Sequence, residues 1–89
     1  MVIATEVSVY PNPFEQLVTV EITCAEEQDC IILLADADND KILRMYGAGL
    51  IKGTNMVPLS NLHSLAPGSY HLDVRTSDGE TLYQTVLFK

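Results

Sequence analysis

Three aspartates in a short polar segment are the side chains of this sequence that come closest to a metal site. Asp36, Asp38 and Asp40 alternate as the first ligands of an EF-hand calcium loop do. The rest of that loop is missing, because Lys41 stands where it needs a glycine and Gly47 where it needs a bidentate glutamate. We therefore interpret the segment as a solvated hairpin turn and predict no tightly bound metal.

No other combination of side chains points to catalysis. His63 and His71 have no second histidine, cysteine or carboxylate at ligand spacing. The serines lack both the strand–turn–helix elbow and the neighbouring base that activate a nucleophile. Glu26 and Glu27 are adjacent in a predicted turn and not in a cleft. The sequence predicts neither an enzyme nor a cofactor.

A carbohydrate-binding platform is poorly supplied with aromatic residues. The chain has four tyrosines and no tryptophan. All four tyrosines fall in predicted strands, where packing in or beside the core is the expected role. They are Tyr10, Tyr46, Tyr70 and Tyr83.

The two cysteines leave two alternatives open. Cys24 and Cys30 flank a turn at residues 25–29 and fall on the predicted inward sides of their strands. If those strands form a hairpin, the register sets the two cysteines opposite each other and a disulfide is sterically plausible. If the strands lie in different sheets, a bridge needs a close approach of the Cα atoms. As free thiols, both residues would act as small buried apolar side chains. An extracellular location would favour the disulfide.

Composition restricts the classes of partner. The 89 residues are 47% hydrophobic, which suffices for one domain and not for two. The net charge of −7 argues against nucleic acid and anionic membranes, because both bind clustered lysine and arginine. The longest apolar run, residues 30–35, is too short to cross a bilayer. The sequence does not begin with a basic segment followed by an apolar stretch, so it predicts no signal peptide.

Short runs of alternating apolar and polar residues predict an all-β fold. The expected strands are residues 6–10, 18–24, 30–35, 42–46, 54–59, 70–75 and 82–88. The 30–35 strand is apolar on both faces, which is typical of a central strand. Asn39 is expected to have a positive φ in the 36–41 turn. Residues 47–53 are expected to form an irregular crossing, and residues 60–67 a connector with a single helical turn.

Seven strands with turns about every ten residues predict an antiparallel β-sandwich. The pair Asp78 and Gly79 predicts a hairpin before the last strand. Its register stays open. A two-residue turn places Tyr83 and Leu87 beside the strand before, whereas a three-residue turn places Leu82 and Val86 there.

Five short motifs follow one another through nearly the whole chain. They are SVYPNPF with VTVEI at residues 8–22, an apolar strand ending in an aspartate, a GTN triplet, LAPGSY at residues 65–70, and a DG hairpin leading to a terminal lysine. In this order they resemble the C-terminal sorting domain of the type IX (Por) secretion system. The positions that carry the resemblance are Pro11, Asn12, Pro13, Phe14, Asp36, Gly53, Asn55, Gly68 and Tyr70. The chain departs from the pattern at Asn39, where the family commonly has glycine, and in its single basic residue at the end, Lys89.

The resemblance implies a seven-stranded Ig-like sandwich at the C-terminus of a larger exported protein. Such a domain is a non-catalytic address, covalently continuous with an upstream cargo domain. Its implied partners are the secretion machinery of the outer membrane and a sortase-like peptidase that removes the domain. The cargo would pass through the periplasm of a Gram-negative bacterium and be released or attached to the cell surface. Residues 1–5 would be a linker remnant and residues 6–89 the sorting domain.

The last strand is the predicted recognition element. If it lies at a sheet edge, its backbone is available for strand addition by a receptor. The proposed recognition residues are Val86, Leu87, Phe88 and Lys89. Residues 11–14 and 68–70 are expected to shape the fold.

Two other functions fit an Ig-like accessory module of a secreted protein. A carbohydrate-binding module would need at least two coplanar exposed tyrosines. A structural or adhesive spacer would need only stability, and a buried, fully paired last strand would favour it.

Overall fold

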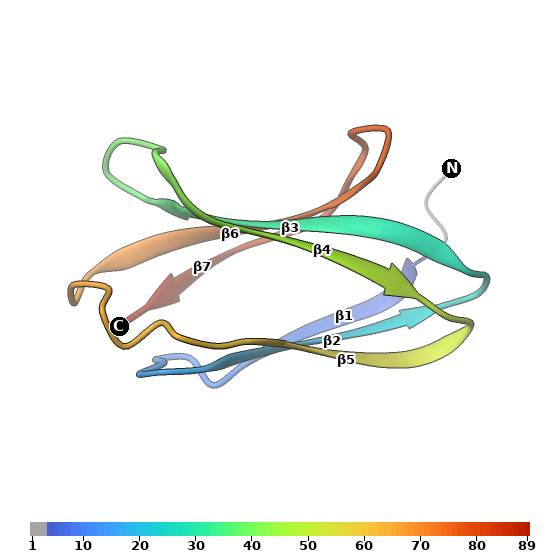
Figure 1. Cartoon of the computed structure of the whole chain (residues 1–89), viewed down its shortest axis with the longest axis horizontal. Coiled ribbons are helices and arrows are strands. Elements are labelled where there is room, and N and C mark those ends of the chain that lie inside the picture. Colours follow the sequence, from blue (N-terminus) through green and yellow to red (C-terminus); the bar gives the residue numbers. More distant parts are fainter. Residues whose placement is uncertain (1–3) are drawn as a thin grey trace.

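The computed structural model describes residues 4–89, with side chains from Glu6 onward, and forms two stacked antiparallel sheets (Figure 1). One sheet has the strand order β1-β2-β5 and the other β4-β3-β6-β7. The strands are β1 (Ala4–Tyr10), β2 (Val18–Cys24), β3 (Gln28–Asp36), β4 (Ile42–Leu50), β5 (Gly53–Leu59), β6 (Ser69–Thr76) and β7 (Thr81–Phe88). The predicted seven-stranded β-sandwich is confirmed.

The core lies between the two sheets, because buried side chains alternate with partly exposed ones along β2, β6 and residues 30–35 of β3. β3 lies between β4 and β6, so the prediction of a central strand is confirmed. The buried apolar residues are Phe14, Val18, Val20, Ile22, Cys24, Cys30, Ile32, Leu34, Leu50, Leu59, Leu62, Tyr70, Leu72, Val74 and Leu87.

The last hairpin adopts the register that places Leu87 opposite Tyr70 and Tyr83 opposite Val74. A bulge between Val74 and Arg75 absorbs the remaining offset beside the turn. Leu87 is consequently buried, whereas Val86 points outward.

Several predicted boundaries were wrong. β1 begins at Ala4, so two residues assigned to the linker belong to a strand; Met1 to Ile3 lie outside the described residues. β4 runs on through Gly47 and Gly49, which were expected in an irregular crossing. Their φ values are not positive, so an extended backbone accommodates them. Residues 60–67 contain a turn and no helix.

The 36–41 turn has its positive φ at Asp40 (56°) and not at Asn39. The Asn39 side chain has a different role, since its Oδ1 accepts a hydrogen bond from Lys41 N at 2.9 Å. In this Asx turn the residue that takes the left-handed conformation is therefore Asp40, one position after the asparagine. Within residues 4–89 no helix is long and apolar enough to cross a membrane.

Candidate recognition surface

One end of the sandwich, on the left in Figure 1, gathers the 11–17 loop, the 36–41 turn, the 60–68 connector and the end of β7. Phe14 is buried there and meets Tyr70 edge to face, with ring centroids 5.9 Å apart. The Tyr70 hydroxyl donates to Ala66 O. Burial, and secondarily the Asp36 carboxylate, raise the pKa of Tyr70. Two motif positions distant in sequence therefore form one packed unit.

The Asn12 side chain closes the outer edge of β7. Its Nδ2 donates to Val86 O at 3.2 Å, and its Oδ1 accepts from Phe88 N at 3.0 Å. Phe14 N donates to Phe88 O at 2.9 Å. The Tyr10–Pro11 and Asn12–Pro13 peptide bonds are cis. The carboxamide and the following backbone thus take the place of an eighth strand beside the end of β7.

Both the side chain and the backbone of Lys89 form hydrogen bonds with the 60–68 connector. Its Nζ donates to Leu65 O at 2.6 Å and to His63 O at 3.2 Å. Its backbone pairs with Gly68, N to O in both directions, at 2.9 and 3.0 Å. The ammonium group therefore holds the connector against the sheet.

The four predicted recognition residues consequently differ in what they offer a receptor. β7 is an edge strand, as strand addition requires. The outward backbone groups of Phe88 are already paired, however, and Leu87 is buried. The side chains of Val86 (41% exposed) and Phe88 (51% exposed) remain on the surface. Both residues offer an apolar side chain, and the outward backbone groups of Phe88 are already taken.

Asp36 organises the turn that follows β3. Its Oδ1 accepts from Asp38 N at 2.8 Å, and its carbonyl accepts from Asp40 N at 2.8 Å. The Asp40 carboxylate lies 3.3 Å from His71 Nδ1. Over residues 4–89 no three His, Cys, Asp or Glu side chains converge on a point that would hold a metal ion. The aspartates are used as turn residues.

Gly53 and Asn55 form the corner where the chain passes from one sheet to the other. Gly53 has a φ of 103°, which side-chain-bearing residues rarely adopt. Asn55 Oδ1 accepts from Ile51 N at 2.9 Å, and its Nδ2 donates to Ile51 O at 2.9 Å and to Ile22 O at 3.2 Å. The GTN triplet therefore fixes the β4–β5 corner to β2.

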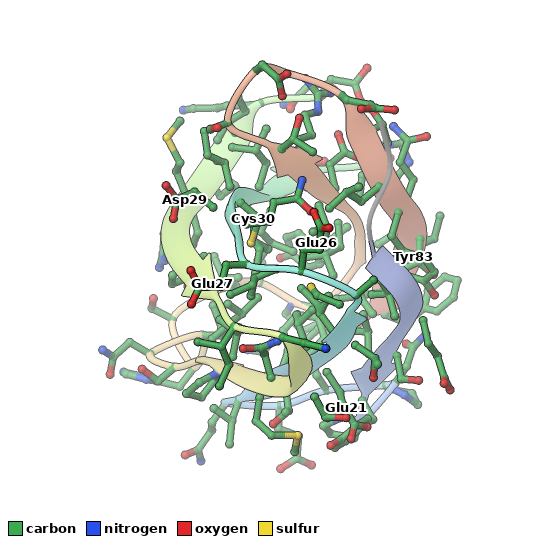
Figure 2. All side chains as sticks on the ribbon, turned by 90° about the vertical axis from the view of Figure 1, so that its right-hand side faces the viewer. Glu21, Glu26, Glu27, Asp29, Cys30 and Tyr83 are labelled. Atoms are coloured by element: carbon green, nitrogen blue, oxygen red, sulfur yellow. The ribbon has the colours of Figure 1, made fainter. Side chains whose placement is uncertain are left out.

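The two cysteines lie in different sheets, so the hairpin pairing considered for β2 and β3 is wrong and the other alternative holds. Both are free, buried thiols. Burial, together with the Cys24 sulfur and Asp29, raises the pKa of Cys30 to about 11. Figure 2 shows Cys30 pointing inward behind Glu26, Glu27 and Asp29 at the end of the sandwich. The disulfide stays a prediction.

A family model described as the secretion system C-terminal sorting domain matches residues 8–88. The match includes the nine positions that carry the resemblance and ends one residue before Lys89. This chain belongs to the type IX secretion C-terminal sorting domains.

The members of this family are non-catalytic C-terminal sorting signals for type IX secretion. No curated protein matches this chain. Among solved structures it is similar to a β-glucosidase of Bifidobacterium adolescentis, with 13% identity and a TM-score of 0.56. The alignment covers 97% of the sorting domain and 16% of the enzyme chain. At that identity the likeness concerns the fold alone.

Sequence reasoning missed the contacts that tie the sorting domain's PNPF segment to its last strand. Asn12 and Phe88 are 76 positions apart. Local periodicity carries no signal for a contact at that separation. The one indication available was that an asparagine between two prolines has no ladder partner of its own.

Proposed function

We propose that this sorting domain directs a cargo fused before it across the outer membrane, for release or attachment to the cell surface. A sortase-like peptidase would then remove the folded domain as a unit. The family match over residues 8–88 is the observation that carries the proposal. A domain tied from its first loop to its last residue, as Asn12 and Lys89 tie this one, can be recognised as a folded body.

Within that function we propose that the receptor reads the side chains of Val86 and Phe88. Both are apolar and about half exposed, on the outer face of β7. Leu87 and Lys89 would contribute indirectly, by fixing β7 to the core and to the connector. Exposed apolar residues beside a polar rim are typical of protein interaction sites.

Export of a fluorescent cargo tests the proposal. An N-terminal signal peptide, the fluorescent protein and this domain are fused and expressed in a host with a type IX apparatus. We expect fluorescence in the medium or on the cell surface. Retention of the intact fusion in the periplasm of a competent host would contradict the sorting function.

Surface variants of the same fusion test the recognition residues. Phe88→Glu is expected to reduce export, and Met56→Glu is the matched control because Met56 is 56% exposed on the other sheet. Deleting residues 86–89 is uninformative, since losing buried Leu87 would cost about 2–5 kcal/mol and unfold the domain. Equal export of the two glutamate variants would remove Phe88 from the receptor site.

The accessory-module alternative is not favoured. Of the four tyrosines only Tyr10 is exposed (40%), so the coplanar pair that a carbohydrate platform needs is missing from the described surface. A pure spacer would bury β7 completely, whereas Val86 and Phe88 remain half exposed.

A further inference from the structure

The four edge strands of the sandwich differ in how they are protected against pairing with another chain. The end of β7 is covered by Asn12, β5 contains Pro58, and β1 carries a bulge between Ala4 and Glu6. Proline, bulges and covering segments are the usual devices that block strand addition. β4 has a bulge near its start, opposite Leu34 and Ala35, and none of these devices from Arg44 to Leu50.

The backbone along β4 offers a regular row of unpaired groups. The hydrogen bond from Asp36 N to Lys41 O shows that the even-numbered residues of β3 direct their backbone toward β4. Their partners in β4 are Arg44, Tyr46 and Ala48. The backbone N–H and C=O groups of the alternate β4 residues therefore point away from β3, toward the open edge of the sheet. These residues are Met45, Gly47 and Gly49, and their outward N–H and C=O groups have no partner among residues 4–89.

No contact or backbone angle within the domain requires glycine at two positions of β4. Neither Gly47 nor Gly49 has a positive φ. A Cβ at Gly47 would meet nothing within 4 Å, and one at Gly49 would meet only Asp29 Oδ1 at 3.6 Å, an ordinary contact. Glycine weakens a strand and often marks a place where another chain or a large side chain lies on the backbone. The bare stretch is next to Met45, which is 65% exposed.

Charge distinguishes the possible occupants. Residues 41–52 contain Lys41, Arg44 and Lys52, three of the five basic residues, and no acidic one. Within residues 4–89 the ion pairs involve Arg75 and His71, and none of these three residues. A second copy paired through β4 would bring two positive stretches together, which opposes self-association. An acidic strand would complement them.

We propose that β4 is a docking edge that takes an added β-strand from an acidic, extended segment of a partner protein. The outward groups of Met45, Gly47 and Gly49 would continue the ladder, and large side chains of the partner would lie over the two glycines. Acidic residues at the ends of the added strand would meet Lys41 and Lys52. This inference goes beyond the sorting function and does not depend on it.

Titration with a synthetic strand tests the docking edge. The probe is a nine-residue peptide of alternating threonine and valine, with a central tyrosine and glutamates at both ends; the control carries lysines in place of the glutamates. We expect slowed hydrogen exchange and shifted NMR resonances at the amides of Met45, Gly47 and Gly49. The lysine peptide should bind about tenfold more weakly. Equal binding of both peptides, or protection centred on Gln84 of β7, would overturn the proposal.

Matched variants separate edge pairing from unfolding. Gly47→Pro removes an outward donor on β4, and Gln84→Pro does the same on β7, the opposite edge of the same sheet. Only Gly47→Pro should weaken binding, by about tenfold or more. If Gly47→Pro fails to fold, the exposed double variant Lys41→Glu/Lys52→Glu should still weaken binding about tenfold at low salt. Unchanged binding of the double variant would overturn the proposal, as would a wild-type dimer in sedimentation.

Discussion

Removing the Asn12 side chain should loosen the end of β7 by an amount that the structure lets us estimate. Asn12→Ala deletes the hydrogen bonds to Val86 O (3.2 Å) and from Phe88 N (3.0 Å). A typical hydrogen bond contributes about 0.5–1.5 kcal/mol net, so the pair is worth about 1–3 kcal/mol. Asn12 is exposed and water replaces part of the loss, which places the expected cost at about 1–2 kcal/mol. For a domain of this size that lowers the Tm by roughly 4–16 °C.

Urea unfolding followed by circular dichroism measures this cost, with Asn39→Ala as the matched control. Asn39 makes one local hydrogen bond within its turn, so its loss should be smaller. A free energy of unfolding for Asn12→Ala within about 0.3 kcal/mol of wild type, or no lower than that of Asn39→Ala, would refute the bridge to β7.

The variant Asn12→Asp adds a pH signature to the same reasoning. Its carboxylate can still accept from Phe88 N, but its second oxygen now faces Val86 O without a proton between them. Folding therefore favours the protonated carboxyl and raises its pKa. The variant should regain stability relative to wild type as the pH falls through that pKa. A stability difference that stays constant between pH 7 and pH 3 would show that the carboxamide does not bridge the two segments.

Three further predictions concern Lys89, Gly53 and the cysteines. Lys89→Met should cost about 1–3 kcal/mol in urea unfolding because two loop carbonyls lose a charged donor; the charge reversal Lys89→Glu should cost at least as much. Gly53→Ala should cost about 1–3 kcal/mol because φ is 103°, whereas Gly47→Ala should cost nothing. The raised pKa of Cys30 means that the unfolded chain ionises first, so stability should fall between pH 9 and about 11 and be independent of this thiol below pH 9. Under oxidising conditions we expect Cys24 and Cys30 to form a disulfide worth on the order of 2 kcal/mol, which intact mass after alkylation would detect as the absence of two labels.

The parts of the fold that the sequence predicted correctly are those that depend on neighbouring residues. The strand at residues 18–24 has its observed bounds because strict alternation is visible within seven residues. The Asp78–Gly79 turn was found in the same way. Its register needed the structure, since β7 has apolar residues on both faces and only packing against β6 selects Leu87.

The errors came from residues whose local preference has more than one outcome. An asparagine such as Asn39 can take a positive φ or close an Asx turn. Its hydrogen bond from Lys41 N shows that it closes an Asx turn here. Glycine is common in turns, which is why Gly47 and Gly49 were expected in an irregular crossing. Neither has a positive φ, so both fit the extended backbone of an edge strand. The site was predicted as a set of residues but not as a set of contacts. The tie between Asn12 and Phe88 depends on how the two sheets stack.

The positions that identify the family have a common structural role, which bears on where recognition resides. Asn12 closes the edge of β7, Phe14 and Tyr70 pack together, and Gly53 permits the corner between sheets. Each acts within the domain, and several have no functional group left to offer a receptor. Likeness to the family therefore follows from the requirements of this sandwich. We therefore expect affinity for the secretion machinery to come from side chains that the fold leaves exposed. Those are the groups that the paired glutamate variants of Phe88 and Met56 address.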